Sequence, residues 1–231
     1  MDMDLSITFP TRQKCYSMIS DNCRLQFITH CNNKYSHIEA ARIALKGGCR
    51  WIQLRMKDAS DLILEEAAII TQKMCKDYGA TFIIDDNVFL ARKINADGVH
   101  LGKNDMPIAE ARDILGDRFI IGCTVNSFND ILSIIQVATP NYFGCGPLRF
   151  TTTKKDLAPT LGCDGYKNII QKMREQKINI PLVAIGGICK NDIPTLLNAG
   201  VNGIALSSSV LNADNPIKEM SQIKDIIFQH L

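Results

Sequence analysis

Short apolar runs rich in β-branched and aromatic residues alternate along this chain with longer segments whose apolar residues recur at helical spacing. Eight of the short runs are expected to form strands, at residues 25–29, 51–55, 81–84, 98–101, 119–122, 142–144, 181–185 and 203–206. The helical spacing lies between them, in segments such as 38–45, 62–74, 88–94, 108–115, 131–137, 166–173 and 193–197. Such alternation is typical of a parallel sheet with helical crossovers. Eight units of this kind predict a single (β/α)8 TIM barrel.

A doubly wound open sheet is the alternative arrangement for alternating strands and helices. That fold usually has fewer strands and a glycine-rich first turn, and no G-x-G-x-x-G follows residues 25–29. The spacing also predicts one long loop, because the sixth and seventh runs begin about 40 residues apart. Catalytic groups of such barrels follow the carboxyl ends of the strands, so residues 146–164 are the first place to look for a site.

The composition fits one compact domain and restricts its partners. Of the 231 residues, 46% are hydrophobic and 22% are charged, which is close to the globular average and excludes a disordered chain. The 26 basic residues nearly balance the 24 acidic ones, for a net charge of +2, and they are spread along the chain. A nucleic-acid partner is therefore not implied. We predict a catalytic domain at residues 25–231, preceded by an extension at residues 1–24.

The sequence also predicts a compartment. No apolar run approaches the length of about 20 residues that spans a bilayer, so no membrane association is expected. Charged side chains interrupt the first 24 residues, which lack the apolar segment of a signal peptide. The nine cysteines include no C-x-x-C pair and are expected to be free thiols. These features favour the cytoplasm.

Polar side chains occupy the end of the second predicted strand. The alternation of a strand puts Gln53, Arg55 and Lys57 on one side, where a barrel interior normally holds aliphatic residues. Two cations there are costly unless an anion meets them, and Arg with Lys is a usual pairing for phosphate oxygens. The sequence favours an anion site over the alternative, a strand end that simply reaches solvent.

Carboxylates follow the next two predicted strands. Asp85 and Asp86 come directly after the third, and Asp105 comes shortly after the fourth. Neighbouring parallel strands are about 4.8 Å apart, so these carboxylates can converge on one hard cation. Mg²⁺ is the natural candidate, because it accepts a few carboxylates together with water and substrate phosphate. The alternative is that Asp85 or Asp86 caps the helix that follows.

Three further loops carry donors for a phosphate group. The long loop holds Thr151, Thr153 and Lys154, the turn after the seventh strand is Gly186-Gly187, and Ser207-Ser208 follows the eighth. Barrels of this class commonly form a phosphate pocket from the loops after strands seven and eight, where backbone amides are accessible. A Gly-Gly turn needed only for its backbone geometry is the alternative.

The combination and order of these motifs closely resemble one family, the thiamin phosphate synthases, over residues 25–217. The strings that carry the resemblance are Gln53-x-Arg55-x-Lys57, Asp86, Ala96-Asp97-Gly98-Val99-His100-Leu101-Gly102 with Asp105, Gly144-x-Gly146-Pro147, Thr151-x-Thr153-Lys154-x-Asp156 and Ala184-Ile185-Gly186-Gly187-Ile188. The resemblance implies a (β/α)8 transferase that joins hydroxymethylpyrimidine diphosphate to a thiazole phosphate, forming thiamin phosphate and releasing diphosphate. These two small molecules are its implied partners, and a homo-oligomer is left open.

The resemblance also implies a role for each site residue. Gln53, Arg55, Lys57 and Lys154 would bind the pyrimidine diphosphate, and Asp86 with Asp105 would hold Mg²⁺. Thr151 and Thr153 would meet the thiazole, with Gly186, Gly187, Ser207 and Ser208 around its phosphate. The expected catalytic residues are Arg55, Lys57, Lys154 and Thr124; Asp85 and Thr124 are expected to contact substrate as well. No protein nucleophile is implied, so positioning and charge neutralisation would do most of the catalysis.

Four positions depart from the family pattern. Asp85 stands where Asn is usual and adds a carboxylate beside the diphosphate, and Lys103 stands where Gln is common and adds a cation nearby. Thr124 replaces Ser and keeps its hydroxyl, whereas Asn126 replaces a common His. The last change argues against the related thiazole tautomerases, since Asn cannot act as their base. A regulator without turnover is a third alternative, but it predicts eroded diphosphate residues, and these are intact.

Overall fold

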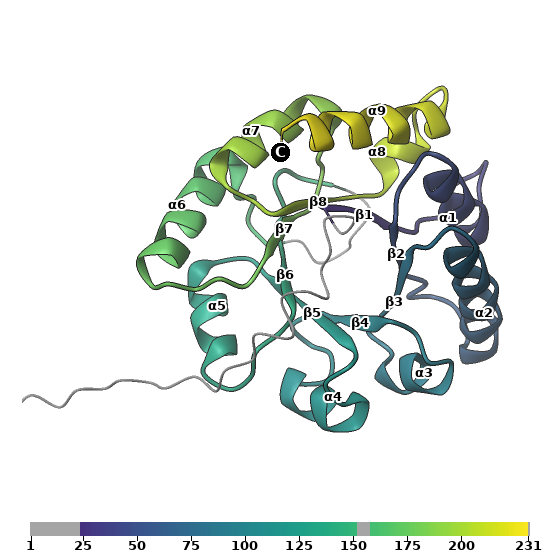
Figure 1. Ribbon diagram of the computed structural model, residues 1–231, viewed down its shortest axis with the longest axis horizontal. Coiled ribbons are helices and arrows are strands. Elements are labelled where there is room, and N and C mark those ends of the chain that lie inside the picture. The colour runs from purple at the N-terminus through teal and green to yellow at the C-terminus, as the bar shows by residue number, and fades with distance from the viewer. Residues whose placement is uncertain (1–23, 152–157, 231) are drawn as a thin grey trace, which may run out of the picture.

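The computed structural model describes residues 24–151 and 158–230. Its centre is a ring of parallel strands that closes in chain order, with β1 paired to both β2 and β8 (Figure 1). The strands are β1 (Leu25–Ile28), β2 (Trp51–Leu54), β3 (Thr81–Asp85), β4 (Gly98–Leu101), β5 (Ile120–Val125), β6 (Tyr142–Cys145), β7 (Leu182–Ala184) and β8 (Gly203–Leu206). The predicted (β/α)8 barrel is confirmed, and the open-sheet alternative is wrong.

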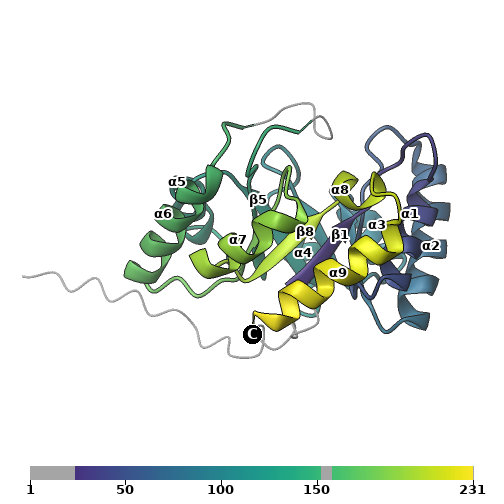
Figure 2. The same ribbon diagram turned by 90° about the horizontal axis from the view of Figure 1, so that it is seen from above.

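The helices surround the ring of strands on its outside (Figures 1 and 2). They are α1 (His37–Lys46), α2 (Asp61–Asp77), α3 (Val88–Lys93), α4 (Ile108–Leu115), α5 (Phe128–Ile135), α6 (Gly162–Glu175), α7 (Ile193–Ala199), α8 (Ser208–Leu211) and α9 (Pro216–Gln229), with a 3₁₀ turn, η3 (Lys190–Asp192), before α7. The first strand begins at the predicted start of the barrel. The predicted extension lies outside the described residues except for Arg24, and that boundary stays a prediction.

Several element bounds differ from the predicted ones for local reasons. Strand β5 continues past residue 122 to Val125, because Thr124 pairs with Gly144 of β6 although it is polar. Helix α5 begins three residues before the predicted start, where the Ser127 side chain accepts a hydrogen bond from the backbone N–H of Asp130. A capped first turn is polar and therefore carries little apolar periodicity.

Helices α8 and α9, which follow the last strand, were not predicted. Helix α9 nevertheless has clear start signals in the sequence. Asn215 caps it by accepting a hydrogen bond from the backbone N–H of Lys218, and Pro216 occupies its first position. The helix buries Met220, Ile223 and Ile227. The regular strand–helix alternation ends before this segment, so counting strand–helix units did not find it.

The barrel interior is a packed floor rather than a channel. Inward side chains of successive strands form one buried cluster: Ile28, Trp51, Ile83, Ile120, Tyr142, Val183 and Ala205. The Trp51 and Tyr142 rings meet edge to face, with centroids 4.8 Å apart. Gly122 makes room for the phenol, because a Cβ there would lie 2.1 Å from the Tyr142 ring. Since alternate residues face inward, the next inward residues toward the carboxyl ends stand on this floor.

Two smaller expectations concern membrane-spanning helices and disulfide bonds. None of the described helices is both long enough and apolar enough to cross a membrane. Within the same residues, no disulfide joins any two of the cysteines, which lie at positions 31, 49, 75, 123, 145, 163 and 189. Cys15 and Cys23 lie outside the described part of the chain.

Candidate active site

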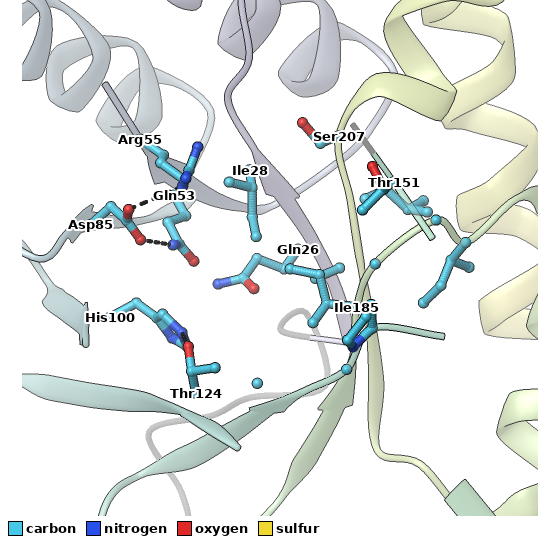
Figure 3. A pocket seen from close by; sticks show the side chains of 18 of the residues that line it. Gln26, Ile28, Gln53, Arg55, Asp85, His100, Thr124, Thr151, Ile185 and Ser207 are labelled. Atoms are coloured by element: carbon cyan, nitrogen blue, oxygen red, sulfur yellow. Dashed lines mark hydrogen bonds and ion pairs between the residues drawn. The ribbon is translucent and has the colours of Figure 1, made fainter. Parts of the chain in front are cut away.

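A pocket opens at the carboxyl ends of the strands, directly beyond the packed floor (Figure 3). It brings together most of the residues that sequence reasoning selected: Gln53, Arg55, Lys57, Asp85, Asp86, Thr124, Thr151, Gly186, Gly187, Ser207 and Ser208. Asp105 adjoins this group, since its carboxylate accepts a hydrogen bond from the backbone N–H of the lining residue Gly102, at 2.6 Å. Thr153 and Lys154 lie outside the described residues, so the structure does not place them.

Strands β2 and β3 supply a charged side of the pocket. The Gln53 amide donates a hydrogen bond to Asp85 Oδ1 at 2.5 Å, and Arg55 Nε lies 3.3 Å from Asp85 Oδ2 (Figure 3). Both carboxylate oxygens of Asp85 are therefore engaged within the protein. Burial raises the pKa of the Asp85 carboxyl, and the positive charges of Arg55 and Lys57 oppose this rise. Among the described residues, Gln53 Oε1 is buried without a hydrogen-bond partner and is available to a ligand.

Two neighbouring carboxylates, Asp86 and Asp105, form a pair, and a lysine lies against the first of them. Lys57 Nζ lies 2.6 Å from Asp86 Oδ2. Burial raises the pKa of the Asp105 carboxyl, and contact with Asp86 raises it further. Asp86 itself has a φ of 63°, a left-handed conformation that is uncommon for a residue with a side chain. Two adjacent carboxylates of this kind form a donor set of hard oxygens.

The alternative for the carboxylates after β3 was that Asp85 or Asp86 caps helix α3. The structure shows that the alternative is wrong, because Asn87 is the cap residue and its side chain accepts a hydrogen bond from the backbone N–H of Leu90. An Asx side chain one residue further on serves the helix better, since its backbone is extended there. Asp85 and Asp86 are thus left to face the pocket.

Lys103 does not supply the extra cation that was expected beside Asp85. Its Nζ lies 2.7 Å from Asp130 Oδ2, on the exposed start of α5. Asp130 also accepts a hydrogen bond from the backbone N–H of Asn126, at 2.7 Å. The Asn126 amide in turn donates to the carbonyl oxygen of Gly146. Lys103 and Asn126 therefore connect two loops of the site, and the charge opposite Asp85 comes from Arg55 and Lys57.

Sequence reasoning missed a row of polar side chains on the barrel floor. His100 Nδ1 lies 2.9 Å from the Tyr142 hydroxyl, and His100 Nε2 lies 3.0 Å from the Thr124 hydroxyl. The Gln26 amide donates to the same Tyr142 hydroxyl at 3.3 Å. His100 lay in a quoted motif, but its inward direction follows only from the two-residue period that begins at Gly98. This row fixes the orientation of Thr124 at the bottom of the pocket.

The opposite side of the pocket, after β7 and β8, carries no charged side chain among the described lining residues. Gly186 and Gly187 both have positive φ, 94° and 67°, so the turn needs glycine for its backbone geometry, as the alternative proposed. Space requires it as well, since a Cβ on Gly187 would lie 2.5 Å from Arg149 Cγ. Ser207 Oγ is buried and has no hydrogen-bond partner among the described residues. Open backbone and an unsatisfied hydroxyl suit a ligand with acceptor oxygens.

The fold and this pocket define a (β/α)8 enzyme with its site at the carboxyl ends of the strands. Residues 25–210 match the family model described as thiamine monophosphate synthase. The thiamine-phosphate synthase of Phocaeicola vulgatus is 57% identical over 202 residues, which cover 87% of this chain and 97% of that protein. Its counterpart in Bacteroides fragilis is 54% identical, with coverage of 87% and 98%. The chain belongs to the thiamine monophosphate synthase family, as the motifs predicted.

A solved structure gives the same result. The thiamine phosphate pyrophosphorylase from Pyrococcus furiosus superposes with a TM-score of 0.80 at 33% sequence identity, covering 91% of this chain and 98% of that one. The crystal structure of a second one, from Bacteroides thetaiotaomicron, has a TM-score of 0.62 at 14% identity and supports the fold alone.

Proposed function

We propose that this enzyme condenses a pyrimidine diphosphate, 4-amino-2-methyl-5-hydroxymethylpyrimidine diphosphate, with 4-methyl-5-hydroxyethylthiazole phosphate to form thiamin phosphate and diphosphate. The observation that carries the proposal is the division of one pocket into two sides. Arg55 and Lys57 supply cations on one side, and Gly187 and Ser207 supply backbone and hydroxyl donors on the other. A diphosphate and a monophosphate carry different charge, and the two sides differ in the same sense.

The chain's own residues would act mainly by binding and by neutralising charge. The bond between the pyrimidine methylene carbon and the diphosphate oxygen breaks with its electron pair going to diphosphate, and the thiazole nitrogen then donates its lone pair to that carbon. Arg55, Lys57 and Lys154 would stabilise the departing diphosphate, which is where negative charge develops. Thr124 and Gln53 would hold the pyrimidine, with Thr151 and Thr153 beside the thiazole. No side chain needs to form a covalent bond to substrate.

Asp86 and Asp105 would hold Mg²⁺. Their chemistry fits this ion, because Mg²⁺ is commonly bound by one or two carboxylates while substrate phosphate and water complete its shell. Among the described residues, no group of three or more His, Cys, Asp or Glu side chains forms a fuller site. When bound there, the ion would neutralise diphosphate oxygens. Lys57 already lies against Asp86, so it can move from the carboxylate to the diphosphate without leaving the pocket.

A second proposal concerns the compartment. We place the enzyme in the cytoplasm, because its cysteine content without a C-x-x-C pair suits a reducing compartment.

The proposed reaction can be tested directly. The purified chain is incubated with both substrates and Mg²⁺, and thiamin phosphate and diphosphate are quantified. We expect equal amounts of the two products, and no product with either substrate omitted. Absence of thiamin phosphate from a folded sample would contradict the proposed reaction.

A further inference from the structure

Exposed apolar side chains are concentrated on one helix. Ten large hydrophobic residues are exposed on the described surface, and four of them belong to α2: Leu62, Ile63, Ile69 and Ile70, at 68%, 54%, 51% and 45% exposure. Phe89, at the start of the neighbouring helix α3, is 65% exposed. The other five are divided among four further places along the chain. Scattered apolar residues need no explanation, but such a group on adjoining helices does.

The four residues of α2 share one face of the helix. Ile69 follows Leu62, and Ile70 follows Ile63, by seven residues, which is two turns. The opposite face is already used, because Ala67, Ala68, Thr71 and Cys75 are buried against the barrel. Figures 1 and 2 both show α2 at the outer edge of the molecule, beside α1 and α3. The apolar face therefore points away from the barrel and from the catalytic pocket.

Helix α3 extends this surface. Lys93 Nζ lies 2.7 Å from Glu65 Oε1, so the two helices are joined by an ion pair at this point. Phe89 precedes Lys93 by one helical turn and lies on the same side of α3. We call Leu62, Ile63, Ile69, Ile70 and Phe89 the α2 face.

The charges on the α2 face are arranged in a direction. Glu66 lies in the first half of the exposed stripe, between Ile63 and Ile70, and Lys73 lies in the second half. Both are exposed, and neither forms a salt bridge with another of the described residues. Glu66 before the central turn and Lys73 after it complement the same two residues of a copy that runs antiparallel, while Asp77, also exposed, lies one turn beyond Lys73 at the last position of α2.

We propose that the α2 face binds the same face of a second copy of this chain, in a twofold dimer. With the twofold axis between Ile69 and Ile70, Glu66 lies opposite the partner's Lys73, and Lys73 lies opposite the partner's Glu66. The four isoleucine side chains of the two helices' central turns then pack at the axis and lose their contact with water. Each charge pair occurs twice by symmetry, at the rim of an apolar centre. The proposal does not depend on the reaction assigned above.

The first test measures the mass of the full chain in solution by sedimentation velocity over a series of concentrations. We expect reversible dimerisation, and we expect Ile69→Lys to raise the dissociation constant by at least about tenfold, since it places two like charges beside the axis. The matched control is Val137→Lys, because Val137 is 77% exposed but lies just beyond α5, outside the α2 face. A chain that stays monomeric at every concentration would overturn the proposal, as would equal effects of the two substitutions.

A charge exchange tests the antiparallel pairing itself. Glu66→Lys alone and Lys73→Glu alone each put like charges opposite one another, and each is expected to weaken the dimer by about tenfold. The double variant Glu66→Lys/Lys73→Glu restores opposite charges and should recover most of the affinity. Synthase turnover should be unchanged in all three, which excludes general misfolding. Additive weakening in the double variant would contradict the antiparallel pairing, because it would show that the two residues do not face each other across the axis.

Discussion

The two sides of the catalytic pocket offer different groups to an anion: paired charges on one side and uncharged donors on the other. On the β2–β4 side, Arg55 and Lys57 are already paired with Asp85 and Asp86 before any substrate is present. On the β7–β8 side, among the described residues, the turn at Gly187 and the hydroxyl of Ser207 have no competing charge in the lining. An anion on the first side must displace carboxylates from their cations or be joined by another cation. An anion on the second side has only to fit.

This difference separates two kinds of sensitivity. The charged side should respond strongly to a lost charge and to the metal concentration, because each ion there is balanced against others. The uncharged side should respond to lost donors, and mainly through substrate affinity. Substitutions on each side test this separation.

Asp105→Asn should lower turnover by about a hundredfold at a limiting Mg²⁺ concentration. The substitution keeps the shape of the side chain but removes one of the two adjacent carboxylates proposed for the metal. The KM for the thiazole phosphate should change little, because that substrate belongs to the other side. Initial rates over a Mg²⁺ series check both statements. Full activity of the parent chain in excess chelator would show that turnover does not require a metal ion.

Lys154→Ala should lower kcat by tens of fold while the affinity for the thiazole phosphate stays nearly constant. The reason is that its charge would matter most as the diphosphate departs. Single-turnover rates, combined with equilibrium binding of the thiazole phosphate, separate the two quantities. An unchanged rate at saturating substrates would mean that Lys154 has no part in the reaction.

Ser207→Ala should raise the KM for the thiazole phosphate by about fivefold and leave kcat nearly unchanged. In the protein without substrate, the same substitution removes a buried hydroxyl that has no partner among the described residues, so thermal stability should be equal or slightly higher. Affinity and stability would thus move in opposite directions. A lower melting temperature with unchanged KM would instead assign the hydroxyl a structural role.

The sequence predicted the fold because its pattern has the period that the barrel requires. All eight strands were found, since each centres on a short apolar run, and runs such as β2 and β8 are buried on both faces. Segments outside the alternation were harder. Helix α9 was missed because it follows the last strand and no further strand marks its end. Its start was nevertheless indicated by Asn215, the cap residue, and by Pro216.

The site residues were predictable as types and positions, but their partners were not. Alternation placed Gln53, Arg55 and Lys57 on one side, and the pocket contains all three. Which carboxylate each cation meets depends on the stagger of neighbouring strands, such as the pairing of Gln53 with Ile83. For that reason Lys103 was expected to add a cation near Asp85 and the diphosphate, whereas it pairs with Asp130. His100 was missed because a histidine within a strand gives no local signal of its partners.

Asp85 gives the smallest expected effect and the sharpest test of the charged side. Its two oxygens contact Gln53 and Arg55, so both are engaged by donors and Asp85 is not placed as a metal ligand. Its negative charge still lies beside the proposed diphosphate. Asp85→Asn removes that charge and leaves one oxygen acceptor for Gln53 or Arg55, so less metal should be needed to neutralise the site. We expect the Mg²⁺ concentration for half-maximal rate to fall by about threefold at a fixed diphosphate substrate concentration.

Lys103→Gln is the matched control for Asp85→Asn, because the partner of Lys103 is Asp130 and the Mg²⁺ dependence should not change. If Asp85→Asn instead raised the required Mg²⁺ concentration, the carboxylate would be a ligand of the ion, since a hard cation would have lost an anionic oxygen. Identical titration curves for parent and variant would show that the Arg55 charge already cancels that of Asp85.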